Sequence, residues 1–147
     1  MKVVVQRVKS ASVTVNNIIT GKITNGILAY VGFDIEDDNS DLDWIARKLP
    51  NLRIFNDRDD KMNLSVLDKE YGILVISQFT LLGNCKRGHR PSYDRAAKPE
   101  EAKSMYNDFI DKLKKYGVSV ESGVFQAHMD VEYVNDGPIT VILDSKE

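Results

Sequence analysis

The chain has 147 residues, of which 42% are hydrophobic and 29% are charged, and its net charge is −2. This length fits one domain, which would bury about 70% of the surface that the unfolded chain exposes. The nearly balanced charge excludes a general binder of polyanions, so any contact with nucleic acid must come from a local patch.

The start of the chain and its cysteine content indicate a cytoplasmic protein. Three consecutive valines, at 3–5, are followed at once by Gln6 and Arg7, and this run is too short for a secretory signal or a transmembrane helix. Cys85 is the single cysteine, which excludes an intrachain disulfide framework and suits a reducing compartment. We therefore expect a cytoplasmic location and no membrane contact.

Most of the predicted elements are strands. Alternating or β-branched segments predict them, in chain order, at 2–8, 12–17, 18–23, 26–33, 72–79, 128–134 and 138–144. The last of these opens on Gly137-Pro138, and a proline is tolerated at the first residue of a strand but not inside a central one. A Gly-Pro pair also fits an ordinary turn.

Two helices are predicted between these strands. At the start of the first, Ser40 followed by Asp43 resembles a capping arrangement, and the helical spacing runs up to Pro50. The second begins near Pro99 and stops at Gly117. The apolar residues at helical spacing are Leu42, Ile45, Ala46 and Leu49 in the first helix, and Ala102, Met105, Tyr106, Phe109, Ile110 and Leu113 in the second.

Many strands and two separated helices predict one α+β domain over residues 1–147, with a mainly antiparallel, barrel-like β-sheet. The usual enzyme motifs do not occur in it, since there is no P-loop, G-x-G-x-x-G, H-E-x-x-H or G-x-S-x-G. The two histidines, His89 and His128, and the lone Cys85 lack the spacing of a zinc site. We therefore expect no metal and no cofactor.

Two polar segments remain unusual. Residues 86–95 carry four Lys or Arg against one Asp, which fits either a phosphate-binding patch or an ordinary solvated loop. Residues 77–80, S-Q-F-T, place polar side chains at the end of an apolar strand, where a sheet can present them to a pocket. A nucleophilic hydroxyl at Thr80 would need a base, and none is near it in the sequence. A strand that simply gives way to a polar loop fits the same pattern.

These motifs together resemble the D-aminoacyl-tRNA deacylase family, also called the D-tyrosyl-tRNA deacylases. The resemblance is carried by S-Q-F-T at 77–80, R-G-H-R-P-S at 87–92 and N-D-G-P-I-T at 135–140. It extends over the whole chain, from V-V-V-Q-R-V-K-S-A-S-V-T-V at 3–15 through L-R-I-F-N-D at 52–57. The resemblance implies an enzyme that hydrolyses the ester bond of D-aminoacyl-tRNA and so proofreads translation.

The family resemblance implies a homodimer with two active sites at the subunit interface. One wall of each site would come from residues Ser77, Gln78, Phe79 and Thr80. The opposite wall would come from Gly137 and Pro138 of the partner subunit, joined by a cis bond, with Arg7 and Asn135 in supporting roles. Such a backbone wall rejects L-amino acids by steric clash and accepts many D side chains, and it also lets glycyl-tRNA through.

The resemblance also implies a mechanism and a partner. The 2′-hydroxyl of the RNA would assist attack by water, and an amide at Phe79 or Thr80 would stabilise the oxyanion. The expected partner is tRNA charged with D-amino acids, bound through Lys86, Arg87 and Arg90, and not DNA. Two alternatives stay open: nucleophilic attack by Thr80, and an inactive dimeric tRNA-binding module.

Overall fold

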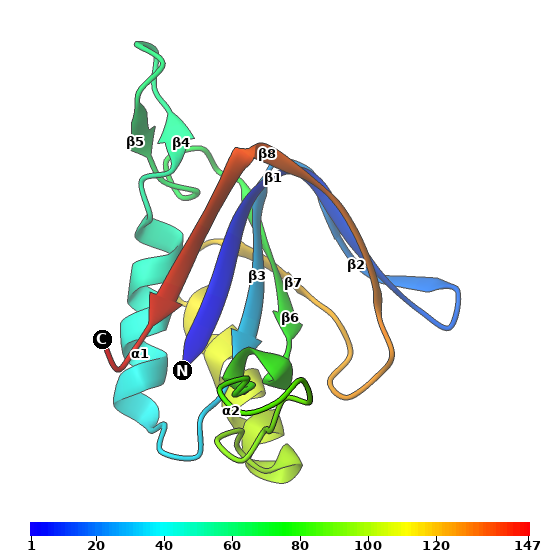
Figure 1. Cartoon of the computed structure of the whole chain (residues 1–147). Coiled ribbons are helices and arrows are strands. Elements are labelled where there is room, and N and C mark those ends of the chain that lie inside the picture. Colours follow the sequence, from blue (N-terminus) through cyan, green and yellow to red (C-terminus); the bar gives the residue numbers. More distant parts are fainter.

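A computed structural model describes all 147 residues of the chain (Figure 1). It contains the strands β1 (Lys2–Val15), β2 (Ile18–Ile23), β3 (Gly26–Gly32), β4 (Phe55–Asn56), β5 (Met62–Leu64), β6 (Gly72–Ser77), β7 (Ser119–Ser122) and β8 (Asp130–Asp144). Its α-helices are α1 (Asn39–Lys48) and α2 (Pro99–Lys114), and two short 3-10 helices are η1 (Leu49–Asn51) and η2 (Phe79–Leu82). Neither α-helix is both long enough and apolar enough to cross a lipid bilayer.

Six strands form one strongly curved sheet in the order β2-β1-β3-β6-β7, with β8 paired along β1. The pairs that β1 makes with β2, β3 and β8 are antiparallel, whereas β3-β6 and β6-β7 are parallel. The two ends of the sheet approach each other at Gly21 of β2, where a Cβ atom would lie 2.7 Å from the carbonyl oxygen of Ser122 in β7. The fold is therefore the predicted α+β class with a mainly antiparallel, barrel-like sheet and two helices.

Both helices cover the same face of the sheet, and the main core lies between these layers (Figure 1). Alternation along the strands sends Ile73 and Val75 into this core, while Leu74 and Ile76 enter a second cluster on the concave face. Strands that are buried on both faces read as continuous apolar runs. This explains why 26–33 and 72–79 showed no alternation in the sequence.

The structure corrects several predicted boundaries. The strands predicted at 2–8 and 12–17 are parts of the single strand β1, which ends at Val15, and those predicted at 128–134 and 138–144 are parts of β8, which begins at Asp130. The pairing of β1 with β8 is irregular around Val8, but each strand continues through this irregularity as one element. The strand predicted at 72–79 ends at Ser77. The short strands β4, β5 and β7 were not predicted.

The cap of α1 was also assigned wrongly. The N-cap is Asp38, and the capping box is completed by Asp41 rather than by Ser40 and Asp43. Asp41 also accepts a 2.7 Å hydrogen bond from Lys146, near the end of the chain. Burial alone would raise the pKa of Asp41, but the hydrogen bonds from Lys146 and from the backbone of Asp38 outweigh it and lower the pKa to about 2. This carboxylate ties α1 to the C-terminal segment.

Candidate active site

The S-Q-F-T segment lies where the chain leaves the sheet. The amide of Gln78 donates a 2.7 Å hydrogen bond to the carbonyl of Val31, and η2 begins at the next residue. The amide N–H groups of Phe79 and Thr80 occupy the first turn of η2, where they have no partner within the helix. Phe79, at 57%, and Thr80 are both exposed, so this turn faces solvent and its two backbone amides are available to a ligand.

A cavity of about 730 Å³ lies beside this turn. It is lined by the ends of β3 and β6, Tyr93, residues 96–98, the start of α2, residues 125–129 and Val131 of β8. Thirteen of its 20 lining residues are hydrophobic, so a ligand with a large apolar surface fits it better than a free ion. Ser77, Gln78 and Phe79 contribute to the lining, but Thr80 does not.

The ionisable residues of the cavity do not form a catalytic pair. They are Tyr30, Tyr93, Lys98 and His128, and no carboxylate lines the cavity. Burial, followed by the influence of Tyr133, raises the pKa of Tyr30 to about 12, so its hydroxyl stays neutral in the physiological range. His128 is almost fully exposed at the rim, 3.5 Å from Asp130. The hydroxyl of Thr80 has no hydrogen-bond partner that could act as its base.

The Gly137-Pro138 motif forms an exposed turn within β8, and its peptide bond is cis. The φ angle of Gly137 is +120°, and a Cβ atom there would lie 2.8 Å from the Ile139 side chain and 3.3 Å from Nη2 of Arg7. An L-residue at this position would therefore move the turn. The turn presents main-chain atoms to its surroundings.

Arg7 and Asn135 hold this turn on β1. Nη1 of Arg7 donates a 2.7 Å hydrogen bond to the carbonyl of Ile54, and its Nε forms a 3.0 Å ion pair with Asp136, without hydrogen-bond geometry. The side-chain amide of Asn135 donates to the carbonyls of Arg7 and Ile139, each at 3.0 Å. The supporting positions that the resemblance implied for Arg7 and Asn135 are therefore next to the turn.

The two motifs lie far apart within one chain. Ser77 pairs with Val31, Val31 with Val3, and the Gly137 turn bulges opposite Arg7. This register separates Ser77 from the turn by about 13 Å along the strands and about 14 Å across them. Figure 1 shows the same separation, since β8 bends at the end of the sheet opposite the ends of β3 and β6. One subunit alone does not bring the motifs together.

The basic segment forms a loop beside the cavity. Its base is closed by two backbone hydrogen bonds between Asn84 and Ser92, of 2.8 and 3.1 Å. Lys86, Arg87 and Arg90 are exposed in this loop and take part in no ion pair. These cations are free to contact phosphates, and they lie near the cavity because Tyr93, just beyond the loop, lines it.

The family model described as D-Tyr-tRNA(Tyr) deacylase matches residues 4–144. The chain belongs to this family. It is 52% identical over 147 residues to a D-aminoacyl-tRNA deacylase of Fervidobacterium nodosum and 49% identical over 147 residues to one of Thermosipho africanus. Both alignments cover 100% of this chain and 99% of the relative. These matches confirm the family and the enzyme class that the motifs predicted.

Solved structures share the fold. One described as "c-Myc DNA Unwinding Element Binding Protein" is 40% identical, with a TM-score of 0.92 over 98% of both chains. Another, described as "Structural Analysis of a probable eukaryotic D-amino acid tRNA deacylase", has a TM-score of 0.81 over 97% of both chains. At 18% identity, this second likeness concerns the fold alone.

Sequence patterns pointed to Ser77, Gln78 and Phe79, which line this cavity, but not to most of the other lining residues. Tyr30, Tyr93, Phe125 and Met129 line the cavity, and none was a candidate. Their apolar or aromatic character is the same as that of core residues, so no sequence pattern distinguishes them. Only their meeting at the ends of β3 and β6 reveals them.

Proposed function

We propose that the protein hydrolyses the ester bond between a D-amino acid and the terminal adenosine of tRNA, releasing the free amino acid and tRNA. Family membership supports this activity. The observation that carries the proposal is the apolar cavity at Ser77–Phe79, which has unpaired amides beside it and no carboxylate in its lining. Such a site suits a substrate that brings its own reacting groups.

We infer that the active enzyme is a homodimer in which Gly137 and Pro138 of one subunit close the cavity of the other. The separation of the two motifs within one chain supports this arrangement, since a site that used both motifs would require a second copy. The turn is exposed, and so are two apolar side chains of the same strand, Val134 and Ile142. An exposed apolar strand face of this kind fits a subunit interface.

The main-chain atoms of this turn would discriminate between D- and L-aminoacyl substrates. Inverting the α-carbon of the substrate exchanges its hydrogen and its side chain, so an L side chain would meet the backbone wall. No contact with the D side chain is needed, and many D-amino acids should therefore be accepted. Glycine has no side chain to clash, so glycyl-tRNA should also be hydrolysed.

The chemistry proposed is attack by water assisted by the 2′-hydroxyl of the terminal ribose. The amide N–H of Phe79 or Thr80 would stabilise the oxyanion, a role for which one donor typically contributes about 100-fold to 1,000-fold in rate. Nucleophilic attack by Thr80 is the second candidate mechanism. Thr80 has no base beside it and does not line the cavity, and both facts favour attack by water over attack by the Thr80 hydroxyl.

The loop that carries Lys86, Arg87 and Arg90 would hold the acceptor stem of the tRNA. Contacts with phosphates set the register of the RNA without reading its sequence. The enzyme would work in the cytoplasm, where charged tRNA is used. An inactive tRNA-binding module would share this loop but would show no turnover.

The experiment that tests the proposal compares D-Tyr-tRNA with L-Tyr-tRNA at a large excess of substrate over protein. We expect multiple turnovers on the D ester, while the L ester decays at the rate of buffer alone. Equal hydrolysis of both esters would contradict chiral selection. Binding of both without turnover would instead support the inactive module.

A further inference from the structure

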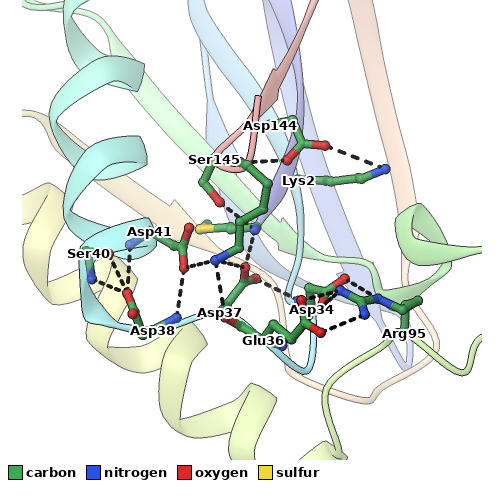
Figure 2. A network of polar contacts seen from close by, with 12 residues as sticks. Lys2, Asp34, Glu36, Asp37, Asp38, Ser40, Asp41, Arg95, Asp144 and Ser145 are labelled. Carbon is green, nitrogen blue, oxygen red and sulfur yellow. Dashed lines mark hydrogen bonds and ion pairs between the residues drawn. The ribbon is translucent and has the colours of Figure 1, made fainter.

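Arg95 makes an unusually complete set of contacts with two carboxylates. Its Nε and Nη2 donate to the two carboxylate oxygens of Asp34 at 3.1 and 2.8 Å, and its Nη1 and Nη2 donate to those of Glu36 at 3.0 and 2.9 Å. Figure 2 shows the guanidinium between the two acidic side chains. Bidentate pairs of this kind fix direction as well as distance.

The backbone reinforces the same connection. The amide of Ile35 donates to the carbonyl of Arg95, and the amide of Ala97 donates to the carbonyl of Phe33, each at 2.9 Å. Side chain and main chain therefore join segment 95–97 to segment 33–36. Both segments adjoin the cavity, since Phe33 and Ala97 are among its lining residues.

The joined segment also supports the aromatic wall next to the S-Q-F-T motif. The ring of Tyr93 packs edge to face on that of Phe79, with 5.1 Å between centroids and 71° between planes. Gly83 allows this approach, because a Cβ atom there would lie 3.1 Å from the Tyr93 ring. A shift of segment 93–97 would therefore move Tyr93 relative to Phe79.

Arg95 is the fourth cation of the basic segment, and it differs from the other three. Its hydrogen bond lowers the pKa of Glu36, which keeps that carboxylate ionised as its partner. With its donors directed to Asp34 and Glu36, Arg95 is not free for phosphates. Because the Arg95 guanidinium is about half exposed, its ion pairs add little to global stability, and the effect of this cluster is local placement rather than folding.

We propose that Arg95 is a positioning residue for the reaction. It holds the wall formed by Tyr93 and segment 96–98 against η2, and so keeps the aminoacyl ester aligned with the amides of Phe79 and Thr80. This inference rests on the proposed deacylase function. It gives Arg95 a task different from that of Lys86, Arg87 and Arg90, although all four belong to one basic stretch.

Steady-state kinetics on D-Tyr-tRNA with Arg95→Gln tests the inference. We expect kcat to fall about 10-fold or more, since small misplacement of a substrate carries losses of this size. The slope of log KM against log salt should stay as in the parent protein. Arg95→Lys should recover only part of kcat, because an ammonium group cannot form two bidentate pairs.

A double-mutant cycle identifies the partner and covers the case in which one variant folds poorly. Glu36→Gln removes the other half of the contact, and it should lower kcat in the same direction as Arg95→Gln. The double variant should be little worse than Arg95→Gln alone. Lys112→Met is the matched control. It breaks the 2.7 Å ion pair between Lys112 and Asp43, which does not line the cavity, so kcat should be unchanged.

A readout without substrate separates this inference from the deacylase function. Trypsin cleavage after Lys86 or Arg87 should accelerate in Arg95→Gln and Glu36→Gln but not in Lys112→Met, because the loop loses one anchor. Unchanged cleavage together with parental kcat would overturn the inference while leaving the function intact. A reduced salt slope in Arg95→Gln would also overturn it, since Arg95 would then contact phosphate.

Discussion

Arg7 and Asp136 form an ion pair of 3.0 Å next to the Gly137-Pro138 turn, and the side chain of Arg7 is only 10% exposed. The same guanidinium donates to the carbonyl of Ile54, so it links the turn to the segment before β4. A buried cation with two such partners is costly to remove, because one partner is left without a compensating charge and the other without a hydrogen bond. Arg7 is therefore one of the side chains, with Asn135, on which the position of the turn depends.

Replacing Arg7 therefore has a specific expected outcome. Arg7→Met should lower the free energy of unfolding by about 2–4 kcal/mol, since it leaves Asp136 and the Ile54 carbonyl without their partner. Deacylation of D-Tyr-tRNA should fall more than 10-fold in the protein that remains folded. Urea unfolding and single-turnover kinetics measure the two effects. An active, equally stable variant would mean that Arg7 does not hold the turn.

The role of Thr80 can be decided with one variant and one substrate analogue. Thr80→Ala should retain a substantial rate on D-Tyr-tRNA, because its amide remains and its hydroxyl lies outside the cavity lining. A D-Tyr-tRNA that lacks the 2′-hydroxyl of its terminal ribose should react much more slowly. Complete loss of activity in Thr80→Ala, with an acyl-enzyme in the parent, would establish the nucleophilic mechanism instead.

The basic loop should govern the salt dependence of tRNA binding. Changing Lys86, Arg87 and Arg90 together to Gln should weaken binding and reduce the slope of log Kd against log salt by about 1 for each phosphate that the loop no longer neutralises. Fluorescence titration from about 50 to about 200 mM salt covers a suitable range. The control changes Arg47 and Lys48 of α1 to Gln, which should leave the slope as it was. The same slope in the loop variant would show that this loop does not touch the RNA.

Acid should weaken the protein through Asp41. Its pKa is about 2 in the folded state against an ordinary 3.8, so its contribution to stability is present above about pH 4 and is lost as the pH falls toward 2. Asp41→Asn should therefore flatten the decline of stability between these values. Urea unfolding at several pH values measures it, with the exposed, unpaired Asp111→Asn as the control. A parallel decline in Asp41→Asn and the parent would contradict the assignment.

Local patterns predicted the parts of the fold that depend on local chemistry. Helical spacing gave α1 and α2, and apolar runs gave β3 and β6, because these features follow from which face is buried. The continuity of β1 and β8 was missed, since it depends on their irregular pairing around Val8. The cap of α1 was missed because Ser40, Asp38 and Asp41 are all plausible caps until the backbone is known.

The candidate site also has parts that local sequence patterns predicted and parts that depend on the fold. The S-Q-F-T and Gly-Pro motifs were recognisable because their residues are consecutive in the chain. Arg95 looked like another phosphate-binding cation, and only the fold shows that Asp34 and Glu36, about sixty positions earlier, take up its donors. The separation of Ser77 from Gly137 also emerges only from strand register.

If one active site uses residues of two copies of the chain, mixing two inactive variants should restore activity. Gln78→Ala alters the cavity wall, and Gly137→Ala displaces the turn, so each homodimer should lose most of its activity. After unfolding and refolding together in equal amounts, half of the dimers are mixed, and each mixed dimer has one intact site. We predict that activity on D-Tyr-tRNA returns to about a quarter of the parental value. If the mixture stays as inactive as the two variants alone, while size analysis confirms mixed dimers, each subunit contains its whole site, which contradicts a site shared between two subunits.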